Sequence, residues 1–357
     1  MKVVFISRST LYSTRGGDTT QVEQTAKHLR LLGIHVDIKL TTDNIEYEKY
    51  DLLHFFNLIR PNDILHHLQK TNKPIIVSPI YVDYSDFDQH DRQGMTRLMA
   101  RAFGKHGSEY LKTVFRSLIG QDSSTSFTYL LGHKRAIKAI LKRTSMLLPN
   151  SKSEAGRIEN DFGNKLAYLV IPNAIDTELF HTKDGVDRNK KQVICVAQIE
   201  GRKNQHRLID ATKDLDVDLV LIGRPSPNNR SYFDYCKKMA HLRVRFIDFL
   251  VHDELTGWYN RSAVHVLPSW FETTGLTSLE AAACGCKLVV SDNGDTDEYF
   301  SGGAEFCRAN STESIKSAIE RALESDYRSV LHQRIKDEFN WANTAKKTLD
   351  AYKEVLS

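Results

Sequence analysis

The stretch from Ala263 to Ser291, AVHVLPSWFETTGLTSLEAAACGCKLVVS, predicts a strand, a loop, a helix and a second strand. Pro268 ends the first apolar run, Gly275 begins the helix, and Gly285 ends it before a β-branched run. A strand, a crossover helix and a second strand in this order form a parallel βαβ unit. In an open parallel sheet the loop after a strand lies at the carboxyl edge, where ligands bind. The stretch therefore predicts an α/β fold with a ligand site in this loop.

Two acids lie eight residues apart in this stretch, Glu272 in the loop and Glu280 inside the helix. The first backbone amides of the helix, those of Gly275, Leu276 and Thr277, have no partner within it and attract an anion such as a diphosphate. A carboxylate further along the helix can accept hydrogen bonds from both hydroxyls of a ribose. The alternative is an ordinary crossover in which an acid near the helix start favours the helix dipole.

Short β-rich runs alternate with helical patterns along most of the chain, which is typical of parallel sheets. The runs expected as strands fall into two series: 2–7, 36–40, 51–55, 74–78, 146–149 and 169–171, then 192–197, 218–222, 244–247, 263–267, 287–290 and 304–306. Each series is long enough for a doubly wound sheet of its own. The polar stretch 176–191 between them predicts a linker.

Two helices are expected near the end of the chain. Asn310 with Glu313 three residues later forms a capping pattern ahead of an apolar stripe. A last helix carries an apolar face that must pack on another element, formed by Trp341, Ala345, Leu349, Tyr352 and Leu356.

A glycine-containing turn follows the first strand of the second series and presents Arg202 and Lys203. Two cations beside a helix start can neutralise a leaving diphosphate without a metal. The alternative is a solvated surface turn.

Composition narrows the class of protein. With 41% hydrophobic and 26% charged residues among 357, the chain is typical of a globular protein with a sizeable core. No apolar run approaches the roughly 20 residues of a membrane-spanning helix, and the first residues lack the apolar stretch of a signal peptide, so a cytoplasmic protein is expected. The 5 cysteines are expected to be reduced, and no metal site is expected, because the pair Cys284 and Cys286 has no further ligands at suitable spacing.

Positive charge is concentrated between residues 92 and 146, where eleven Lys or Arg face only Glu109 and Asp122. One interpretation is a solvated helical face. The other is a surface that meets an anion such as a lipid headgroup or a lipid-linked diphosphate, with peripheral attachment to the inner face of the cell membrane. Nucleic acid is not expected, because the aromatic residues of this segment form no motif of a nucleic-acid-binding module.

Taken together, these features resemble the family 4 retaining glycosyltransferases of GT-B fold over nearly the whole chain. The E-x7-E motif of that family is matched by Glu272 and Glu280 in the specific context PSWFETTGLTSLEAAACG. Further matches are Gly16-Gly17, 172–176 with Phe180, Lys203, 221–223, 253–255 with Tyr259, and 293–298. The resemblance implies two Rossmann-like doubly wound domains facing a cleft: 1–175 for the acceptor and 176–339 for the nucleotide sugar, with a helix of about 340–357 packing back on the first.

The resemblance also implies roles for individual residues. Glu280 would hold the nucleotide ribose, Lys203 the donor diphosphate, and Glu272 the transferred sugar. The remaining donor-binding residues implied are the amides of Gly275, Leu276 and Thr277, the cation of Arg202, Gln198 near it, the glycines Gly16 and Gly17, and Gly223 and Leu250 in the base pocket.

Two positions depart from the family pattern. Gln198 stands where the family usually has an arginine, five residues before the lysine. The stretch 78–84 lacks the histidine that the family often places near the reacting sugar, and Tyr81 or Asp83 is expected there, on the acceptor side.

The function implied is a retaining, metal-independent transfer of a sugar from a nucleotide-diphosphate donor to a glycan or lipid-linked acceptor, with no cofactor, in bacterial surface polysaccharide or lipopolysaccharide synthesis. Two alternatives stay open: a non-catalytic partner subunit of the same fold, and an enzyme of similar architecture such as a nucleotide-sugar epimerase or a phosphorylase. The context of the paired glutamates argues against an epimerase or a phosphorylase, whereas Gln198 and the missing histidine keep the partner subunit open.

Overall fold

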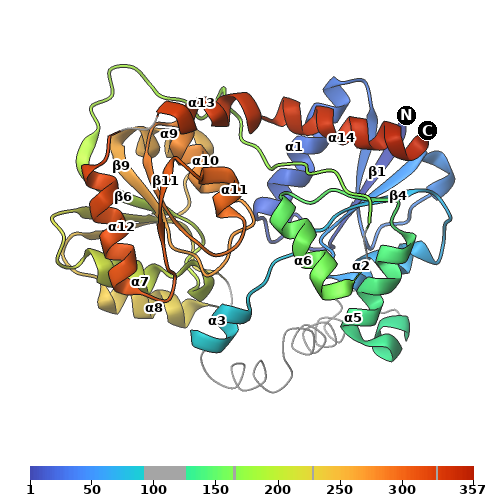
Figure 1. Cartoon of the computed structure of the whole chain (residues 1–357), viewed down its shortest axis with the longest axis horizontal. Coiled ribbons are helices and arrows are strands. Elements are labelled where there is room, and N and C mark those ends of the chain that lie inside the picture. Colours follow the sequence, from blue (N-terminus) through green and yellow to red (C-terminus); the bar gives the residue numbers. More distant parts are fainter. Residues whose placement is uncertain (92–125, 164–165, 227–228, 327–328) are drawn as a thin grey trace. The chain divides into compact units, whose positions relative to one another are not determined.

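The computed structural model describes residues 1–91, 126–163, 166–226, 229–326 and 329–357 (Figure 1). The chain divides into two compact units. Unit 1 comprises Met1–Ser85, the described part of 93–173, and Trp341–Ser357. Unit 2 comprises Ala174–Asn340 and also residues 86–91, which the sequence analysis assigned to the first domain.

Unit 1 is built on a parallel sheet of five strands in the order β2-β1-β3-β4-β5. The strands are β1 (Lys2–Ser7), β2 (His35–Leu40), β3 (Leu52–Phe56), β4 (Ile75–Ser78) and β5 (Met146–Leu147). Every residue of β3 and β4 is buried, since helices cover both faces of the sheet and leave no polar side to alternate with an apolar one.

Two hydrophobic clusters, one on each face, join the helices of unit 1 to its sheet. The helices are α1 (Gly17–Leu31), η1 (Tyr47–Lys49), α2 (Pro61–Leu68), α5 (Ser126–Arg143), α6 (Lys152–Phe162) and α14 (Trp341–Leu356). Helix α3 (Ser85–His90) belongs to unit 2 from its second residue on. The last helix, α14, packs beside α1, and its Tyr352 hydroxyl lies 2.7 Å from Nδ1 of His54 in β3 (Figure 1). The carboxy-terminal helix is thereby part of the core of unit 1.

Unit 2 contains a parallel sheet of six strands in the order β11-β10-β9-β6-β7-β8. The strands are β6 (Asn189–Val196), β7 (Asp218–Ile222), β8 (Val244–Ile247), β9 (Ser262–Leu267), β10 (Lys287–Ser291) and β11 (Ala304–Cys307). The chain winds outward from β6 to β8, then returns to the other side of β6 and winds outward from β9 to β11. The loops after β6 and β9 therefore diverge at a switch point, where ligands bind in open α/β sheets.

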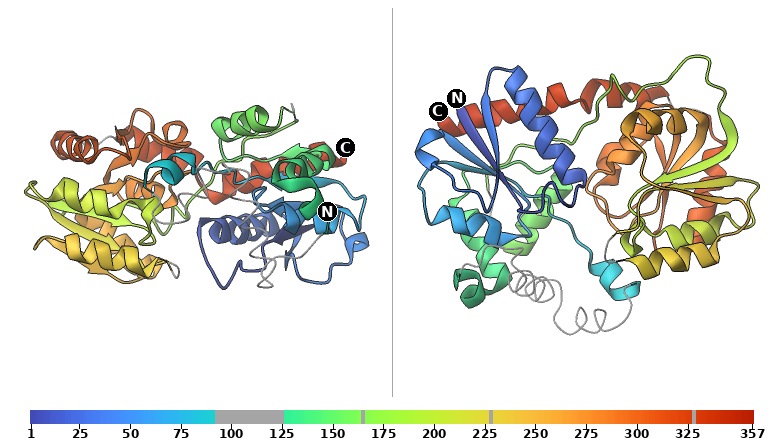
Figure 2. Two further views of the ribbon diagram at one scale, coloured as in Figure 1. Left: turned by 90° about the horizontal axis from the view of Figure 1, so that it is seen from below. Right: turned by 180° about the vertical axis from the view of Figure 1, so that it is seen from behind.

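Helices cover both faces of the second sheet, as Figure 2 shows from behind. They are η2 (Gly201–Lys203), α7 (Gln205–Thr212), α8 (Arg230–Met239), α9 (His252–Arg261), α10 (Leu276–Ala283), α11 (Thr296–Phe300), α12 (Thr312–Glu324) and α13 (Ser329–Glu338). One cluster joins α9, α10, α11 and α13 to the sheet, and the other joins α7, α8 and α12. The α/β class and the two parallel sheets expected from the sequence are confirmed.

Four local predictions are wrong. The strand expected at 169–171 does not form. The Leu169 and Ile171 amides donate to the Leu147 and Pro149 carbonyls, but only Tyr168 forms a bridge to β5. The cap of α12 is the hydroxyl of Ser311, which accepts from the Ser314 amide at 3.1 Å, and not Asn310.

The apolar stripe of α14 stops short of its end, where Leu356 is 37% exposed. The stretch 176–191, predicted as a linker, is part of unit 2. Its Arg188 guanidinium donates to the Cys284 carbonyl at 2.8 Å, and its last three residues already belong to β6, which begins at Asn189.

Among the described residues, no helix has the length and apolar character needed to cross a bilayer. The described cysteines are all buried and free, and burial raises the pKa of the Cys195 and Cys286 thiols to about 12. No group of three or more His, Cys, Asp or Glu residues within the described ranges has the arrangement of a metal site.

Candidate active site

The predicted site residues of unit 2 follow the carboxyl ends of its strands. Gln198, Arg202 and Lys203 come after β6, the loop 268–275 comes after β9, and 292–295 comes after β10. Because β6, β9 and β10 are neighbours in the sheet, these three loops share one edge. Residues up to 97 positions apart in the sequence, from Gln198 to Asp295, are thereby brought to one edge of the sheet.

Lys203 and Glu272 form an ion pair between Nζ and Oε1 across two of these loops. Lys203 ends the short helix η2, where its amide donates to the Glu200 carbonyl at 2.9 Å. The two side chains keep 25% and 12% of their surface exposed, so the pair lies in a recess that remains in contact with solvent. A partly buried ion pair of this kind holds both side chains in fixed orientations.

The backbone of Glu272 is fixed from the other side by the loop after β10. The Asp295 amide donates to the Glu272 carbonyl at 2.8 Å, and Gly294 bridges Glu272 in the manner of a parallel strand pair. Gly294 has φ of +99°, and a Cβ there would lie 2.1 Å from the Glu272 carbonyl oxygen. Only glycine permits this approach, which makes Gly294 a requirement of the site.

Glu280 lies on α10 with 9% of its surface exposed. Its carboxylate accepts a hydrogen bond from the Tyr259 hydroxyl of α9 at 3.1 Å. Burial raises the pKa of Glu280 to about 8, and the hydrogen bond from Tyr259 counteracts part of that shift. Burial also raises the pKa of Tyr259 well above its ordinary value, so the hydroxyl stays a donor.

The start of α10 has the geometry that the sequence predicts. Gly275 precedes the helix in the left-handed conformation, with φ of +73°. The amides of Ser278 and Leu279 turn back to the Gly275 carbonyl, at 2.8 and 3.2 Å. Leu276 and Thr277 are then the positions whose amides face out of the helix, at the positive end of its dipole.

Gly223 and Leu250 follow β7 and β8 on the same edge. Gly223 has φ of +148°, and a Cβ there would lie 2.0 Å from the Ala197 carbonyl oxygen, so glycine lets the loops after β7 and β6 approach. Leu250 is half-buried against the cluster that contains α9 and α10. The base pocket expected at these two residues stays a prediction.

Neither Arg202 nor Gln198 directs positive charge at the paired-glutamate loop: the Arg202 guanidinium is bound by an acid, and Gln198 is neutral. One guanidinium nitrogen of Arg202 donates to both carboxylate oxygens of Glu200, at 2.9 and 3.0 Å. Gln198 is exposed, and its carbonyl accepts from the side chain of Gln205 at 2.9 Å. Lys203 is thus the cation of this turn that is directed to the paired-glutamate loop.

The predicted residues of unit 1 separate into two groups. Gly16 and Gly17 form the cap and first residue of α1, in the loop after β1. Tyr81 is 1% exposed, and its hydroxyl donates to Asp161 at 2.5 Å, so its side chain packs inside unit 1 rather than offering a hydroxyl to an acceptor. Asp83 accepts from the Ser85 amide at 2.9 Å at the start of α3.

Most of the basic segment 92–146 lies outside the described residues. In its described part, Lys134, Arg135, Lys142 and Arg143 are exposed along the second half of α5. They form a positive helical face, which fits both interpretations given above.

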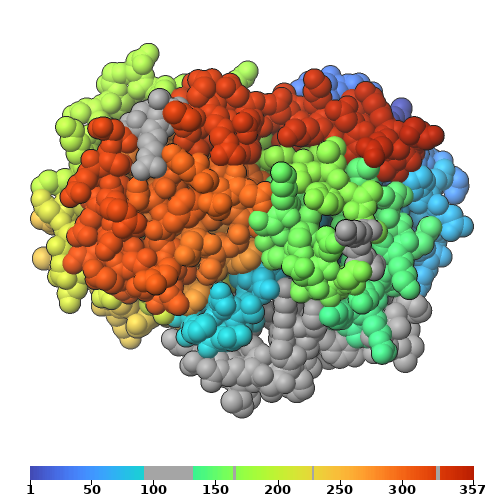
Figure 3. Space-filling view, viewed as in Figure 1, coloured from blue at the N-terminus to red at the C-terminus, as the bar shows by residue number. Residues whose placement is uncertain are grey.

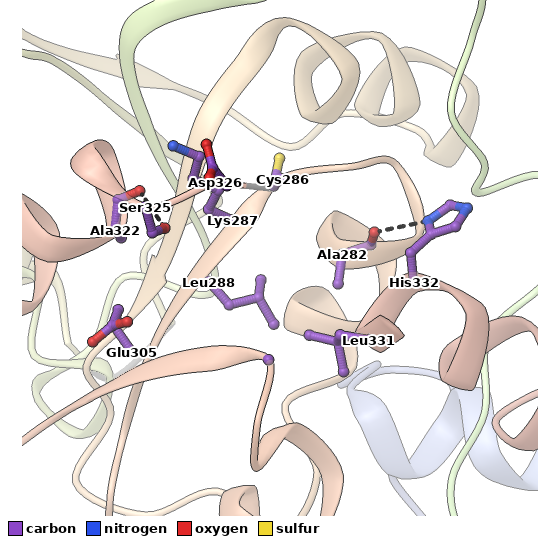
Figure 4. A pocket seen from close by; sticks show the side chains of 11 residues that line it. Ala282, Cys286, Lys287, Leu288, Glu305, Ala322, Ser325, Asp326, Leu331 and His332 are labelled. Atoms are coloured by element: carbon purple, nitrogen blue, oxygen red, sulfur yellow. Dashed lines mark hydrogen bonds between the residues drawn. The ribbon is translucent and has the colours of Figure 1, made fainter. Parts of the chain in front are cut away.

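A small pocket of unit 2 lies at the opposite edge of the sheet, near the start of β10 and β11 (Figure 4). Leu331 and His332 of α13 line it, and Nδ1 of His332 lies 3.3 Å from the Ala282 carbonyl. Its volume of about 20 Å³ has room for one water molecule, so it is too small for a nucleotide sugar.

Two residues of the site were not assigned roles from the sequence. Tyr259 and Gly294 both lie in the segments that matched the family, yet their functions depend on contacts with Glu280 and Glu272 that are distant in sequence. The signal available was the motif itself, which carries no information on contact partners.

Two parallel-sheet α/β units, with a switch-point site on the second, define the GT-B fold class. Residues 176–347 match the family model described as glycosyl transferases group 1. This match confirms, over residues 176–347, the family resemblance found in the sequence.

Related proteins and structures extend this result. The chain is 29% identical to an alpha-maltose-1-phosphate synthase of Mycobacterium tuberculosis over 220 residues, 53% of this chain and 57% of that protein. It is 28% identical to a glycogen synthase of the same species over 258 residues, 68% of this chain and 62% of that protein. The matches thus span little more than half of these curated relatives.

Solved structures share the fold over the full length of the chain. Sucrose-phosphate synthase of Thermosynechococcus elongatus has a TM-score of 0.77 at 17% identity, covering 99% of both chains. Anabaena Alr3699/HepE in complex with UDP-glucose has a TM-score of 0.69 at 15% identity, covering 99% of this chain and 100% of that one. At these identities the likeness establishes the GT-B fold.

Proposed function

We propose that this chain is a retaining glycosyltransferase that transfers a sugar from a nucleoside-diphosphate donor to a hydroxyl of a carbohydrate acceptor. The observation that carries the proposal is the Lys203–Glu272 ion pair at the switch point, in the loop that leads into the helix carrying the buried Glu280. The group 1 family match of residues 176–347 supports it.

Each group of the site has a chemical task in this reaction. The Glu280 carboxylate accepts hydrogen bonds from the ribose hydroxyls of the donor. Lys203 and the outward amides at the start of α10 hold the diphosphate. Glu272 lies between Lys203, the cation that holds the diphosphate, and the loop after β10, in position to bind hydroxyls of the transferred sugar.

The pairing of Glu272 favours an orienting role over a nucleophilic one. A carboxylate oxygen that accepts from the Lys203 ammonium has its lone pair engaged and is a weaker nucleophile than an unpaired one. We infer that the acceptor hydroxyl attacks on the face from which the diphosphate leaves. The hydroxyl proton passes to a diphosphate oxygen, and the anomeric configuration is retained.

Transition-state stabilisation in this scheme is electrostatic. Negative charge grows on the leaving diphosphate, and Lys203 and the amides of α10 are fixed where that charge develops. These groups provide positive charge from the protein itself, so we propose a reaction without a metal or other cofactor. Arg202 assists less, because Glu200 binds its guanidinium.

We propose a glycan or lipid-linked acceptor and a role in bacterial surface polysaccharide or lipopolysaccharide synthesis. Relatives named as an alpha-maltose-1-phosphate synthase and a glycogen synthase support a carbohydrate acceptor. The positive charge of 92–146 supports contact with an anionic lipid surface. Flotation with anionic vesicles, absent with neutral ones and weakened by salt, is the result expected of this contact, and salt-insensitive flotation would contradict it.

The test begins with thermal unfolding of the wild type and Glu280→Ala in the presence of UDP, GDP, ADP and their sugar conjugates. One nucleotide is expected to stabilise the wild type, by about 2.7 kcal/mol at 100 times its Kd, and to stabilise the variant far less. Acceptor-dependent release of the nucleoside diphosphate and the anomeric configuration of the product then test the transfer. Stabilisation by none of the nucleotides would contradict the proposal and favour a non-catalytic partner subunit.

A further inference from the structure

Helix α3 belongs to unit 2, although the chain on either side of it belongs to unit 1. Figures 1 and 2 show α3 next to the first helices of unit 2, and in Figure 3 its residues, in cyan, border the orange surface of unit 2. Phe87 lies against Gly201, where a Cβ would be only 3.2 Å from the phenyl ring. The helix therefore rests on the turn that carries Lys203.

Helix α3 contacts Trp270, two residues before Glu272. His90 stacks on the indole with ring centroids 6.1 Å apart and planes at 10°, and Phe87 lies 6.3 Å away. The guanidinium carbon of Arg207, on α7, lies 5.2 Å from the centre of the same ring. Trp270 is thereby enclosed by side chains of α3 and α7, and it is 2% exposed.

These ring contacts are what holds the indole of Trp270. The indole N–H of Trp270 and the hydroxyl of Ser269 are buried and have no hydrogen-bond partner in the described part of the chain. The backbone before Glu272 is held by two hydrogen bonds: Asn204 donates to the Pro268 carbonyl at 3.0 Å, and the Trp270 amide donates to the Arg202 carbonyl at 2.9 Å. At Glu272 itself, the loop after β10 holds the backbone, as described above. The enclosure of the indole is therefore a further constraint on the loop, at the end opposite to the contacts of Glu272 with the loop after β10.

Asp91, directly after α3, fixes this enclosure. Its carboxylate lies 3.0 Å from a guanidinium nitrogen of Arg207 and 3.7 Å from Nε2 of His206. The carboxylate and the guanidinium are 14% and 20% exposed, so solvent screens the pair only partly. The same Arg207 nitrogen also donates to Asn204 at 3.0 Å, which extends the network to the residue that binds Pro268.

We propose that Asp91 is a positioning residue for the donor site: through Arg207 and Trp270 it sets the orientation of the loop that carries Glu272. This inference rests on the proposed function for its effect on turnover, whereas its effect on the loop is independent of any substrate. Asp91 itself touches no reacting atom in this scheme.

Hydrogen exchange of the intact chain, followed by mass spectrometry, tests the effect on the loop without any ligand. Asp91→Asn is expected to speed exchange of the amides in 269–275 by about threefold or more, because the loop opens more often. Arg207→Ala removes the same ion pair from the other side and is expected to act in the same direction. Asp86→Asn is the matched control, since Asp86 lies exposed on α3. In this variant the amides of 269–275 are expected to exchange as fast as in the wild type.

Turnover provides the second measurement. Asp91→Asn is expected to lower kcat about tenfold with a smaller change in KM for the donor, since a misplaced Glu272 weakens transition-state binding more than ground-state binding. Asp91→Glu is expected to restore most of the rate.

Unchanged exchange of 269–275 in both Asp91→Asn and Arg207→Ala would overturn the proposal. Faster exchange with unchanged turnover of an active wild type would also overturn it, because the loop position would then have no effect on the site. A wild type that turns over no donor contradicts the proposed function, and the exchange result alone then decides whether Asp91 positions the loop.

Discussion

The raised pKa of Glu280 predicts that nucleotide affinity depends on pH. In the free protein, burial holds the pKa of this carboxyl at about 8, so at neutral pH it is mostly protonated. Ribose hydroxyls donate most effectively to the ionised carboxylate, so binding favours ionisation and lowers the pKa of Glu280 in the complex. Affinity is therefore expected to rise with pH up to about the pKa of the free protein.

The size of the effect follows from the fraction of ionised carboxylate. If only the ionised form binds, the apparent Kd is the intrinsic Kd multiplied by one plus the ratio of protonated to ionised protein. With a pKa of about 8, that factor changes about 90-fold between pH 6 and pH 9, with most of the change below pH 8.

Calorimetric titration with the nucleoside diphosphate that stabilises the protein measures this dependence at several pH values. The terminal phosphate of the ligand also ionises near pH 6, so the ligand adds a slope of its own. Glu280→Gln is the matched control, because its side chain has nearly the same size and no ionisation, and it retains only the slope of the ligand. Equal pH dependence in the wild type and in Glu280→Gln would refute the reasoning.

Three further predictions concern the same unit. Lys203→Gln is expected to lower kcat/KM for the donor by about 100-fold or more, whereas Arg202→Gln has a smaller effect because Glu200 binds the Arg202 guanidinium. Steady-state rates of both variants measure this, and equal losses would contradict the assignment of Lys203 to the diphosphate. Gly223→Ala is expected to destabilise the protein by about 3 kcal/mol or more in urea unfolding, because its Cβ would meet a carbonyl oxygen at 2.0 Å, whereas Gly33→Ala, also at positive φ but in open space, is expected to cost only about 1–2 kcal/mol. The pKa of Glu280 is about 8 in the folded state and 4.5 ordinarily, so between these pH values the folded state binds a proton that the unfolded state does not. The contribution of Glu280 to the free energy of unfolding is therefore fully present below pH 4.5 and is lost as the pH rises through about 8, and urea unfolding of Glu280→Gln is expected to lack that decline.

Local signals in the sequence were sufficient for the elements that bear the site. Alternation of apolar runs with turn residues predicted β7 and β8 at their observed bounds, and glycine at a helix start predicted the cap of α10. These signals are local because strand and helix preferences act over a few residues. The end of α14 and the cap of α12 were mispredicted, since neighbouring residues satisfy the same local pattern and packing selects between them.

The sequence by itself determined that the chain has two parallel sheets and that a loop with two acids follows one strand of the second. The tertiary structure alone decided that Glu272 pairs with Lys203, that Tyr259 donates to Glu280, and that α3 packs on Trp270. Contacts between residues 21, 69 or 180 positions apart depend on strand order and on how helices cover the sheet. The physical reason is that burial and ion pairing arise only when distant segments exclude water together, and no short stretch of sequence encodes that arrangement.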